Sequence, residues 1–136
     1  MMLLSHDDRL TWARTIAGEA RGESRRGQLA VAFVPFNRAR LSGRSVAQEC
    51  TRKWQFSCWN TDDPNRATIL ALQEHALVPF FSHILAILSG KADPSHRATF
   101  YHVLSIQPRW SIGREPCAII GGHRFYRNIA PYLEPA

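Results

Sequence analysis

One segment limits the fold of this chain more than any other. From Ser24 to Val34 the residues are apolar on almost every side of a helix, and such a helix must be buried among other elements. A chain of 136 residues forms about one domain, so we expect this helix at the centre of a single domain, residues 1–136. Pro35 follows it, and because proline lacks the backbone donor it should kink or stop the helix.

Four further helices are predicted around the central one. Ser5 can cap the first, which should end at Gly22. Ser45 and Gln48 resemble a capping box, and Gly90 closes the last helix. The predicted helices span residues 5–20, 24–34, 45–52, 65–75 and 79–89.

The C-terminal third has a shorter, mixed pattern. Residues 98–103 and 119–126 are predicted strands, the second broken by Gly121 and Gly122. No linker rich in Pro, Gly or Ser divides the chain. The sequence therefore predicts an α+β domain that is mainly α, with a small irregular or β C-terminal part.

The N-terminus, the hydropathy and the cysteines exclude several classes of protein. The chain starts without the basic region of a secretory signal peptide, and no run approaches the ~18 apolar residues that span a bilayer. We expect synthesis in the cytoplasm and no stable membrane insertion. Cys50, Cys58 and Cys117 are too few for a disulfide scaffold. Free buried thiols are favoured, and a Cys50–Cys58 bridge stays open.

The charge is basic, with 17 Lys and Arg against 11 Asp and Glu. The cations are arginines apart from Lys53 and Lys91, and they are scattered along the chain. Three explanations remain: nucleic acid, an anionic polymer such as a bacterial cell wall, or a solvated face. Because no dense basic block appears, nucleic acid is not the expected partner.

Two carboxylates, Glu19 and Glu23, lie four residues apart. In one continuous helix they would repel each other, but Gly22 indicates that a helix ends between them. A helix C-terminus disfavours negative charge near Glu19, and a helix N-terminus favours it near Glu23. Such a pair is typical of a general acid with an ionised partner. The alternative is that both are surface glutamates at helix ends.

Residues 54–60 form an aromatic, irregular segment. Sugars present flat apolar faces edged with hydroxyl groups, which suit aromatic rings beside amides and hydroxyls. The possible platforms are Trp54, Phe56 and Trp59, and the possible polar partners are Gln55, Ser57 and Asn60. The alternative is a small aromatic core under a loop.

Two histidines near the predicted strands, His102 and His123, could be metal ligands or donors in the wall of a site. Together with Cys50 and Cys58 they match no zinc spacing. We therefore expect no metal and no other cofactor.

These motifs together resemble the cell wall hydrolase family of the spore-cortex-lytic type. The resemblance covers most of residues 12–127, in the expected order. It is carried by Ile16–Glu23, Gly27–Ala32, Asn37–Arg38, Gln55–Asn60, Ala98–His102, Pro108–Trp110 and Gly121–Tyr126. Pro35 and Phe100 depart from the family pattern, which usually has an aliphatic residue and a small or polar residue there.

The resemblance implies a compact lysozyme-like or lytic-transglycosylase-like fold and activity on peptidoglycan. It implies that Glu19 is the single catalytic residue and Glu23 a supporting carboxylate. It also implies glycan contacts in the aromatic motif and the Tyr-His pair. The expected substrate-binding residues are Gln55, Phe56, Trp59, Asn60, Tyr101 and His102.

The expected reaction is cleavage between N-acetylmuramic acid and N-acetylglucosamine by a lytic transglycosylase mechanism. A hydrolytic muramidase, with Glu23, Asp62 or Asp63 as second carboxylate, is the nearest alternative. A zinc amidase and a non-enzymatic, arginine-rich nucleic-acid-binding phage protein are the others. The chain resembles phage or prophage endolysins, which implies a monomer that reaches the wall with a separate membrane-permeabilising protein.

Overall fold

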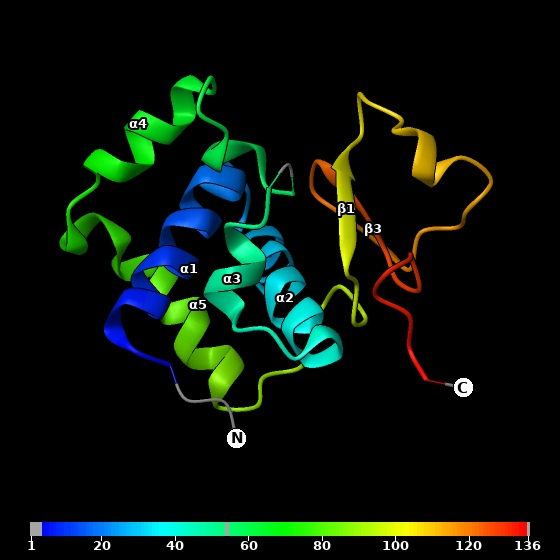
Figure 1. The fold of residues 1–136 in the computed structure, drawn as a ribbon, viewed down its shortest axis with the longest axis horizontal. Helices are drawn as coiled ribbons and strands as arrows, with labels where there is room; N and C mark the ends of the chain where they lie inside the picture. Colours follow the sequence, from blue (N-terminus) through cyan, green and yellow to red (C-terminus); the bar gives the residue numbers. More distant parts are fainter. Residues whose placement is uncertain (1–3, 54, 136) are drawn as a thin grey trace.

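The computed structural model describes residues 4–53 and 55–135. Figure 1 shows a group of helices on one side and a small sheet on the other, with α2 between them. The mainly helical α+β fold predicted from the sequence is confirmed. The elements are α1 (His6–Ala20), α2 (Arg25–Ser42), α3 (Val46–Cys50), η1 (Ser57–Trp59), α4 (Pro64–Ala71), η2 (Glu74–Leu77), α5 (Val78–Leu88), β1 (Phe100–Val103), η3 (Arg109–Ser111), β2 (Ala118–Ile120) and β3 (His123–Tyr126).

Helix α1 is fixed by its caps. The Ser5 hydroxyl accepts the Asp8 N–H, and the Asp8 side chain accepts the Ser5 N–H, which completes a capping box. At the other end, a short turn leads to Ser24, whose side chain accepts the Gly27 N–H and caps α2. The predicted break between Glu19 and Glu23 is confirmed.

Helix α2 is the buried centre of the fold, as predicted, but Pro35 does not stop it. The helix continues through Pro35 to Ser42 and ends at Gly43, which has a φ of 78°. Pro35 is buried, with apolar residues on both sides of it in the sequence. Proline removes one backbone hydrogen bond, and burial of the long apolar face of α2 outweighs that loss.

The later helices differ from the prediction in their ends. The capping box of α3 forms between Ser45 and Gln48. Helix α4 begins at Pro64, which Asp63 precedes as N-cap, and it ends at Ala71 rather than at residue 75. Leu72 is extended and packs against both core clusters, which favours the break.

The C-terminal part is a three-stranded antiparallel sheet in the order β1-β3-β2. Tyr101 pairs with Phe125 and His102 with Arg124. The predicted strand over residues 119–126 is a hairpin, because the chain turns at Gly121, whose φ is 55°. Only glycine adopts such a conformation at little cost.

Two apolar clusters form the core. The first is made by helices α1, α2, α3 and α5 with η2, and it includes Trp12, Leu29 and Ile84. The second joins helices to the sheet through residues such as Val34, Cys58 and Phe125. The helical group therefore has a core of its own, whereas the sheet shares one.

The described cysteines are free thiols, as predicted, and the Cys50–Cys58 bridge is not formed. Burial raises the pKa of Cys50 to about 12. Within the described ranges, no single helix is long and apolar enough to cross a membrane; α4 and the segment Glu74–Leu88 reach that length only as a pair bent by 108°.

Candidate active site

Glu19 lies in the last turn of α1, where three elements meet. The backbone N–H of Cys58 in η1 donates to its Oε2 at 3.3 Å. The Tyr101 hydroxyl, from β1, donates to its Oε1. The Glu19 side chain is half-buried. Its carboxylate is thus held on one oxygen by the helical group and on the other by the sheet.

The approach of η1 to Glu19 depends on Gly18. A Cβ at this position would lie 2.7 Å from the Cβ of Cys58 and 2.8 Å from its Sγ. Only glycine lets Cys58 come close enough for its N–H to reach the neighbouring carboxylate. Two further bonds hold the segment: Trp59 Nε1 donates to Thr15 Oγ1 at 2.8 Å, and Asn65 Nδ2 donates to the Gly18 carbonyl at 2.6 Å.

Tyr101 holds the other side of the Glu19 carboxylate. Its ring packs against Phe125, with ring centroids 5.7 Å apart, and edge-on against His123 at 5.0 Å. Burial, and then the charge of Glu19, raise the pKa of Tyr101 well above its usual value. The hydroxyl therefore keeps its proton, and a neutral hydroxyl can both donate and accept.

Glu23 has a different environment. Its Oε1 accepts the N–H of Gly122 at 2.9 Å. A Cβ on Gly121 would lie 2.3 Å from the same oxygen, so the hairpin turn can close over Glu23 only as glycine. Glu23 thereby fixes the β2–β3 turn to the start of α2.

His123 lies beside this contact. Its Nδ1 is 3.8 Å from Glu23 Oε1 and is buried without a hydrogen-bond partner among the described residues. Burial lowers the pKa of His123, while the charge of Glu23 opposes that shift. Tyr101 and His123 thus form a line of side chains between the two glutamates.

Two of the predicted substrate-binding residues are buried. Phe56 is 2% exposed, and the Arg38 guanidinium lies over its ring at 5.1 Å. His102 is 8% exposed; its Nε2 contacts the Tyr126 hydroxyl at 2.9 Å and its Nδ1 the Val103 carbonyl at 2.8 Å. A buried ring offers no face to a sugar, so Phe56 lies in the small aromatic core that was the alternative.

The other predicted contacts are more accessible. Gln55 is half-buried, and its Oε1 accepts a hydrogen bond from Arg38 Nη1 at 3.0 Å. Trp59 and Asn60 are half-buried and line a hollow of about 200 Å³ with Arg52. Trp54, which the sequence predicts as a platform, lies outside the described residues.

Arg38 has a structural role at the site that the sequence did not predict. It is buried in α2, its Nε donates to the Thr99 carbonyl at 2.6 Å, and its guanidinium lies over the rings of Phe100 and Tyr132. Burial lowers its pKa, and the nearby Tyr132 and Glu49 oppose the shift. The signal in the sequence was a charged residue close to the apolar stretch of α2, because a buried charge requires polar or aromatic partners.

The metal alternative finds no support in the geometry. Within residues 4–53 and 55–135, no group of three or more His, Cys, Asp or Glu side chains is placed to hold an ion. Cys50, Cys58, His102 and His123 are therefore not placed together as ligands of one metal ion.

Comparison with known proteins identifies the family. The sequence profile described as Cell Wall Hydrolase matches residues 22–126. The chain belongs to the cell wall hydrolase family. The resemblance seen in the sequence is confirmed, and the protein is an enzyme rather than a non-enzymatic binding protein. Glu23 lies inside the matched range and Glu19 three residues before it. No curated protein matches the chain.

Two solved structures of this family's fold match nearly the whole chain. One is the catalytic domain of the germination-specific lytic transglycosylase SleB from Bacillus anthracis, with 25% identity, a TM-score of 0.73, and coverage of 91% of this chain and 97% of that one. The other is the catalytic domain of the Bacillus cereus SleB protein, with 24% identity, a TM-score of 0.74, and coverage of 93% and 94%.

Proposed function

We propose that this cell wall hydrolase cleaves peptidoglycan between N-acetylmuramic acid and N-acetylglucosamine by a lytic transglycosylase mechanism, with Glu19 as the catalytic residue. The observation that carries the proposal is the pair of contacts on the Glu19 carboxylate, from Tyr101 and from the N–H of Cys58. The likeness to the SleB lytic transglycosylase domain supports it.

The reaction needs one carboxyl group that first gives and then takes a proton. Protonated Glu19 donates to the glycosidic oxygen as the bond from C1 to that oxygen breaks. The muramic acid 6-hydroxyl then attacks C1, and its proton passes to the Glu19 carboxylate. The product is a 1,6-anhydro sugar, and no water is consumed.

Tyr101 suits both halves of this cycle. Its hydroxyl can donate to Glu19 when the carboxylate is ionised and accept from it when it is protonated. Because its raised pKa keeps it neutral, it adds no negative charge beside the acid. Tyr101 is therefore a positioning residue that holds the carboxyl group in one orientation.

Two of the three candidates for the second carboxylate of a muramidase already accept a hydrogen bond from a backbone N–H. Inverting and retaining glycosidases normally use two carboxylates. Glu23 accepts the Gly122 N–H, and Asp63 accepts the Asn65 N–H as the cap of α4. Asp62 is exposed and remains the hydrolytic candidate. This distribution supports the mechanism with a single glutamate.

The exposure of each side chain indicates which of the predicted residues can contact the glycan. Trp59 and Asn60, beside their hollow, are the proposed glycan contacts. Gln55, Phe56 and His102 support the site from within, because Gln55 and Phe56 contact Arg38 and both ring nitrogens of His102 are used.

The test is digestion of purified peptidoglycan followed by mass spectrometry. Glu19→Gln should lower the rate by about 10²–10⁴-fold, the usual contribution of general acid–base catalysis, with an unchanged circular dichroism spectrum. Asp62→Asn should keep the rate, and the wild-type products should be anhydro sugars, one water lighter than reducing sugars. An active Glu19→Gln variant would refute the assignment of Glu19, and reducing ends would indicate a muramidase.

A role in lysis is also proposed, on the resemblance to endolysins. It predicts that expression inside a bacterium lyses the cell only when a membrane-permeabilising protein is produced with it. Lysis by Glu19→Gln under the same conditions would contradict this role.

A further inference from the structure

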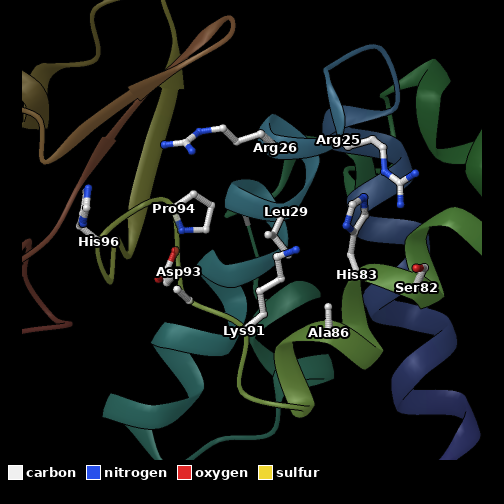
Figure 2. A pocket seen from close by; sticks show the side chains of 11 residues that line it. Arg25, Arg26, Leu29, Ser82, His83, Ala86, Lys91, Asp93, Pro94 and His96 are labelled. Carbon is white, nitrogen blue, oxygen red and sulfur yellow. The ribbon is translucent and has the colours of Figure 1, made fainter.

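A hollow of about 590 Å³ lies between the first turn of α2, helix α5 and the loop that leads to β1. Its lining includes Arg25, Arg26, His83 and Lys91, and does not include Glu19. Figure 2 shows Arg25 and Arg26 pointing apart from the start of α2, with Lys91 between them in this view. A second hollow of about 410 Å³ shares Arg25 and His83 with it. The two together are far larger than a single small ion.

The lining of the hollow carries more positive than negative charge, with Arg25, Arg26 and Lys91 against Asp93. Arg25, Arg26 and Lys91 are exposed, and none of them forms an ion pair with another residue in the described ranges. The acidic residue in the lining, Asp93, forms its hydrogen bonds with Asn37 of α2 and with its own loop, and no ion pair with these cations is found among the described residues. Its carboxylate accepts hydrogen bonds from Asn37 Nδ2 at 2.8 Å, from the backbone N–H and the hydroxyl of Ser95, and from the backbone N–H of Arg97.

The two arginines occupy a place that the helix itself disfavours. Helix α2 begins with Arg25 and Arg26 and has no acidic residue in its first turn. The N-terminus of a helix carries partial positive charge, so cations there are destabilising. A sequence breaks such a local rule most often where function requires it.

His83 lies in the lining with these cations, and its burial and the charges of two of them lower its pKa. It is 7% exposed, and its Nε2 contacts Gln28 Oε1 at 3.0 Å. Burial lowers its pKa, and the charges of Arg25 and Lys91 lower it further. The hollow therefore holds a buried imidazole whose pKa is lowered by burial and by the charges of two other lining residues, Arg25 and Lys91.

We propose that this hollow binds an anionic group of the wall polymer, either a carboxylate of a stem peptide or a phosphodiester of an attached polymer. Arginine binds both groups with paired hydrogen bonds. The hollow lies at the start of α2, and its first lining residue, Arg25, follows Glu23 by two positions in the sequence. The inference rests on the proposed function and adds which part of the substrate the protein recognises.

The first test compares two variants that each remove two positive charges, in a Glu19→Gln background that keeps the polymer intact. Arg25→Gln with Arg26→Gln should weaken cosedimentation with purified peptidoglycan by about tenfold, as expected for loss of charged hydrogen bonds. The control, Arg9→Gln with Arg114→Gln at exposed sites outside the hollow, should change it by less than about twofold.

The melting temperature distinguishes a loss of binding from a failure of the variant to fold. Because the helix N-terminus disfavours cations, the Arg25 and Arg26 double variant should melt at the same or a higher temperature than its parent. Weaker binding at an unchanged or raised melting temperature supports the site. Equal binding by the two double variants overturns it.

The source of the anion is found by changing the polymer. If stem-peptide carboxylates are the ligand, their conversion to neutral methylamides abolishes the difference between the two double variants. If phosphodiesters are the ligand, their removal by acid does so. If the difference survives both treatments, or if duplex DNA shows it equally, the hollow is a general polyanion surface and the proposal is wrong.

A soluble probe separates this inference from the proposed function. The disaccharide N-acetylglucosaminyl-N-acetylmuramic acid with its stem peptide lacks the bond that Glu19 is proposed to cut. Its addition to wild-type protein should shift the NMR signals of the His83 ring, and the same compound with its carboxylates converted to neutral methylamides should not. This result is readable even if Glu19 proves not to be catalytic. No shift with the peptide-bearing probe, together with no effect of acid treatment, contradicts the site.

Discussion

The helices pack on one another through an apolar cluster, whereas the sheet is attached to α2 by polar contacts and a shared edge of the core. Trp12, Phe33 and Ile84 are among the buried residues that join helices to helices. The sheet contributes Ile120 and Phe125 to the second cluster, while Val103 and Ile119 on its strands are 40% and 59% exposed. The sheet could not bury its own apolar face without the helices.

Polar bonds compensate for this small apolar contact. Asn37 Nδ2 donates to the Ala98 carbonyl at 2.9 Å, and Arg38 holds the Thr99 carbonyl just before β1. Glu23 holds the hairpin turn through Gly122. Since Tyr101 reaches Glu19 from the sheet, the geometry of the candidate active site depends on this polar docking. Four predictions test the difference between the two regions.

The largest effect is a loss of stability expected for Arg38→Ala. The change leaves the Thr99 carbonyl without its donor and removes the cation from three aromatic rings. Loss of one member of a buried charged network typically costs about 3–5 kcal/mol, measured by chemical denaturation. Hydrogen exchange should show the sheet opening before α1.

Arg40→Ala is the matched control for Arg38. Arg40 is exposed and pairs with Glu134 at 2.9 Å, and surface pairs of this kind contribute about 0–1 kcal/mol. If both variants lose the same stability, or if α1 and the sheet open together, polar docking by Arg38 is not what distinguishes the two regions.

A smaller loss of stability is expected for Gly18→Ala, a substitution within the helical group. The added Cβ would overlap Cys58, and overpacking costs about 1–3 kcal/mol, offset by about 1 kcal/mol because alanine favours a helix. The displaced η1 should also lower the rate of peptidoglycan digestion. Gly22→Ala, with no atom within 4 Å of its added Cβ, should affect neither stability nor rate.

Tyr101→Phe should lower activity more than stability. It removes the hydroxyl that contacts Glu19 and keeps the ring packing. We expect about a tenfold lower kcat with little change in KM, equivalent to one hydrogen bond to a charged group. Tyr126→Phe removes a hydroxyl from the same sheet that contacts His102 rather than Glu19, so its kcat should stay within about twofold. Equal kcat losses would show that the effect comes from the sheet as a whole.

The smallest effect is expected on the pH dependence of stability. Burial lowers the pKa of His83 in the helical group and of His123 in the sheet below the usual 6.5. Below about that pH the unfolded chain binds protons that the folded protein refuses, so stability falls as pH decreases, by at most about 1.4 kcal/mol per pH unit for each histidine.

Denaturation curves from pH 7 to pH 5 test this effect. His83→Gln and His123→Gln should each flatten part of the pH dependence. Glu23→Gln should steepen it, because the Glu23 charge favours protonated His123. If neither histidine variant changes the slope, the fall in stability has another origin.

Local features were predictable from the sequence because each depends on neighbouring residues. Ser5 and Ser24 cap α1 and α2, and the break between the helices places Glu19 and Glu23 on opposite sides of it. The capping box of α3 and the turn at Gly121 follow from equally local chemistry. The basic composition indicated attraction to anions, but not where an anion would bind.

The tertiary structure decided everything that depends on distant residues. The contact between Glu19 and Tyr101 joins residues 82 positions apart, and Phe56 is buried because Arg38 and the sheet cover it. Pro35 stays within α2 because burial of the whole helix outweighs one lost hydrogen bond. Helix ends are set by the hydrogen bonds of a few adjacent residues, whereas burial and the partners of a side chain are set by which elements pack against it.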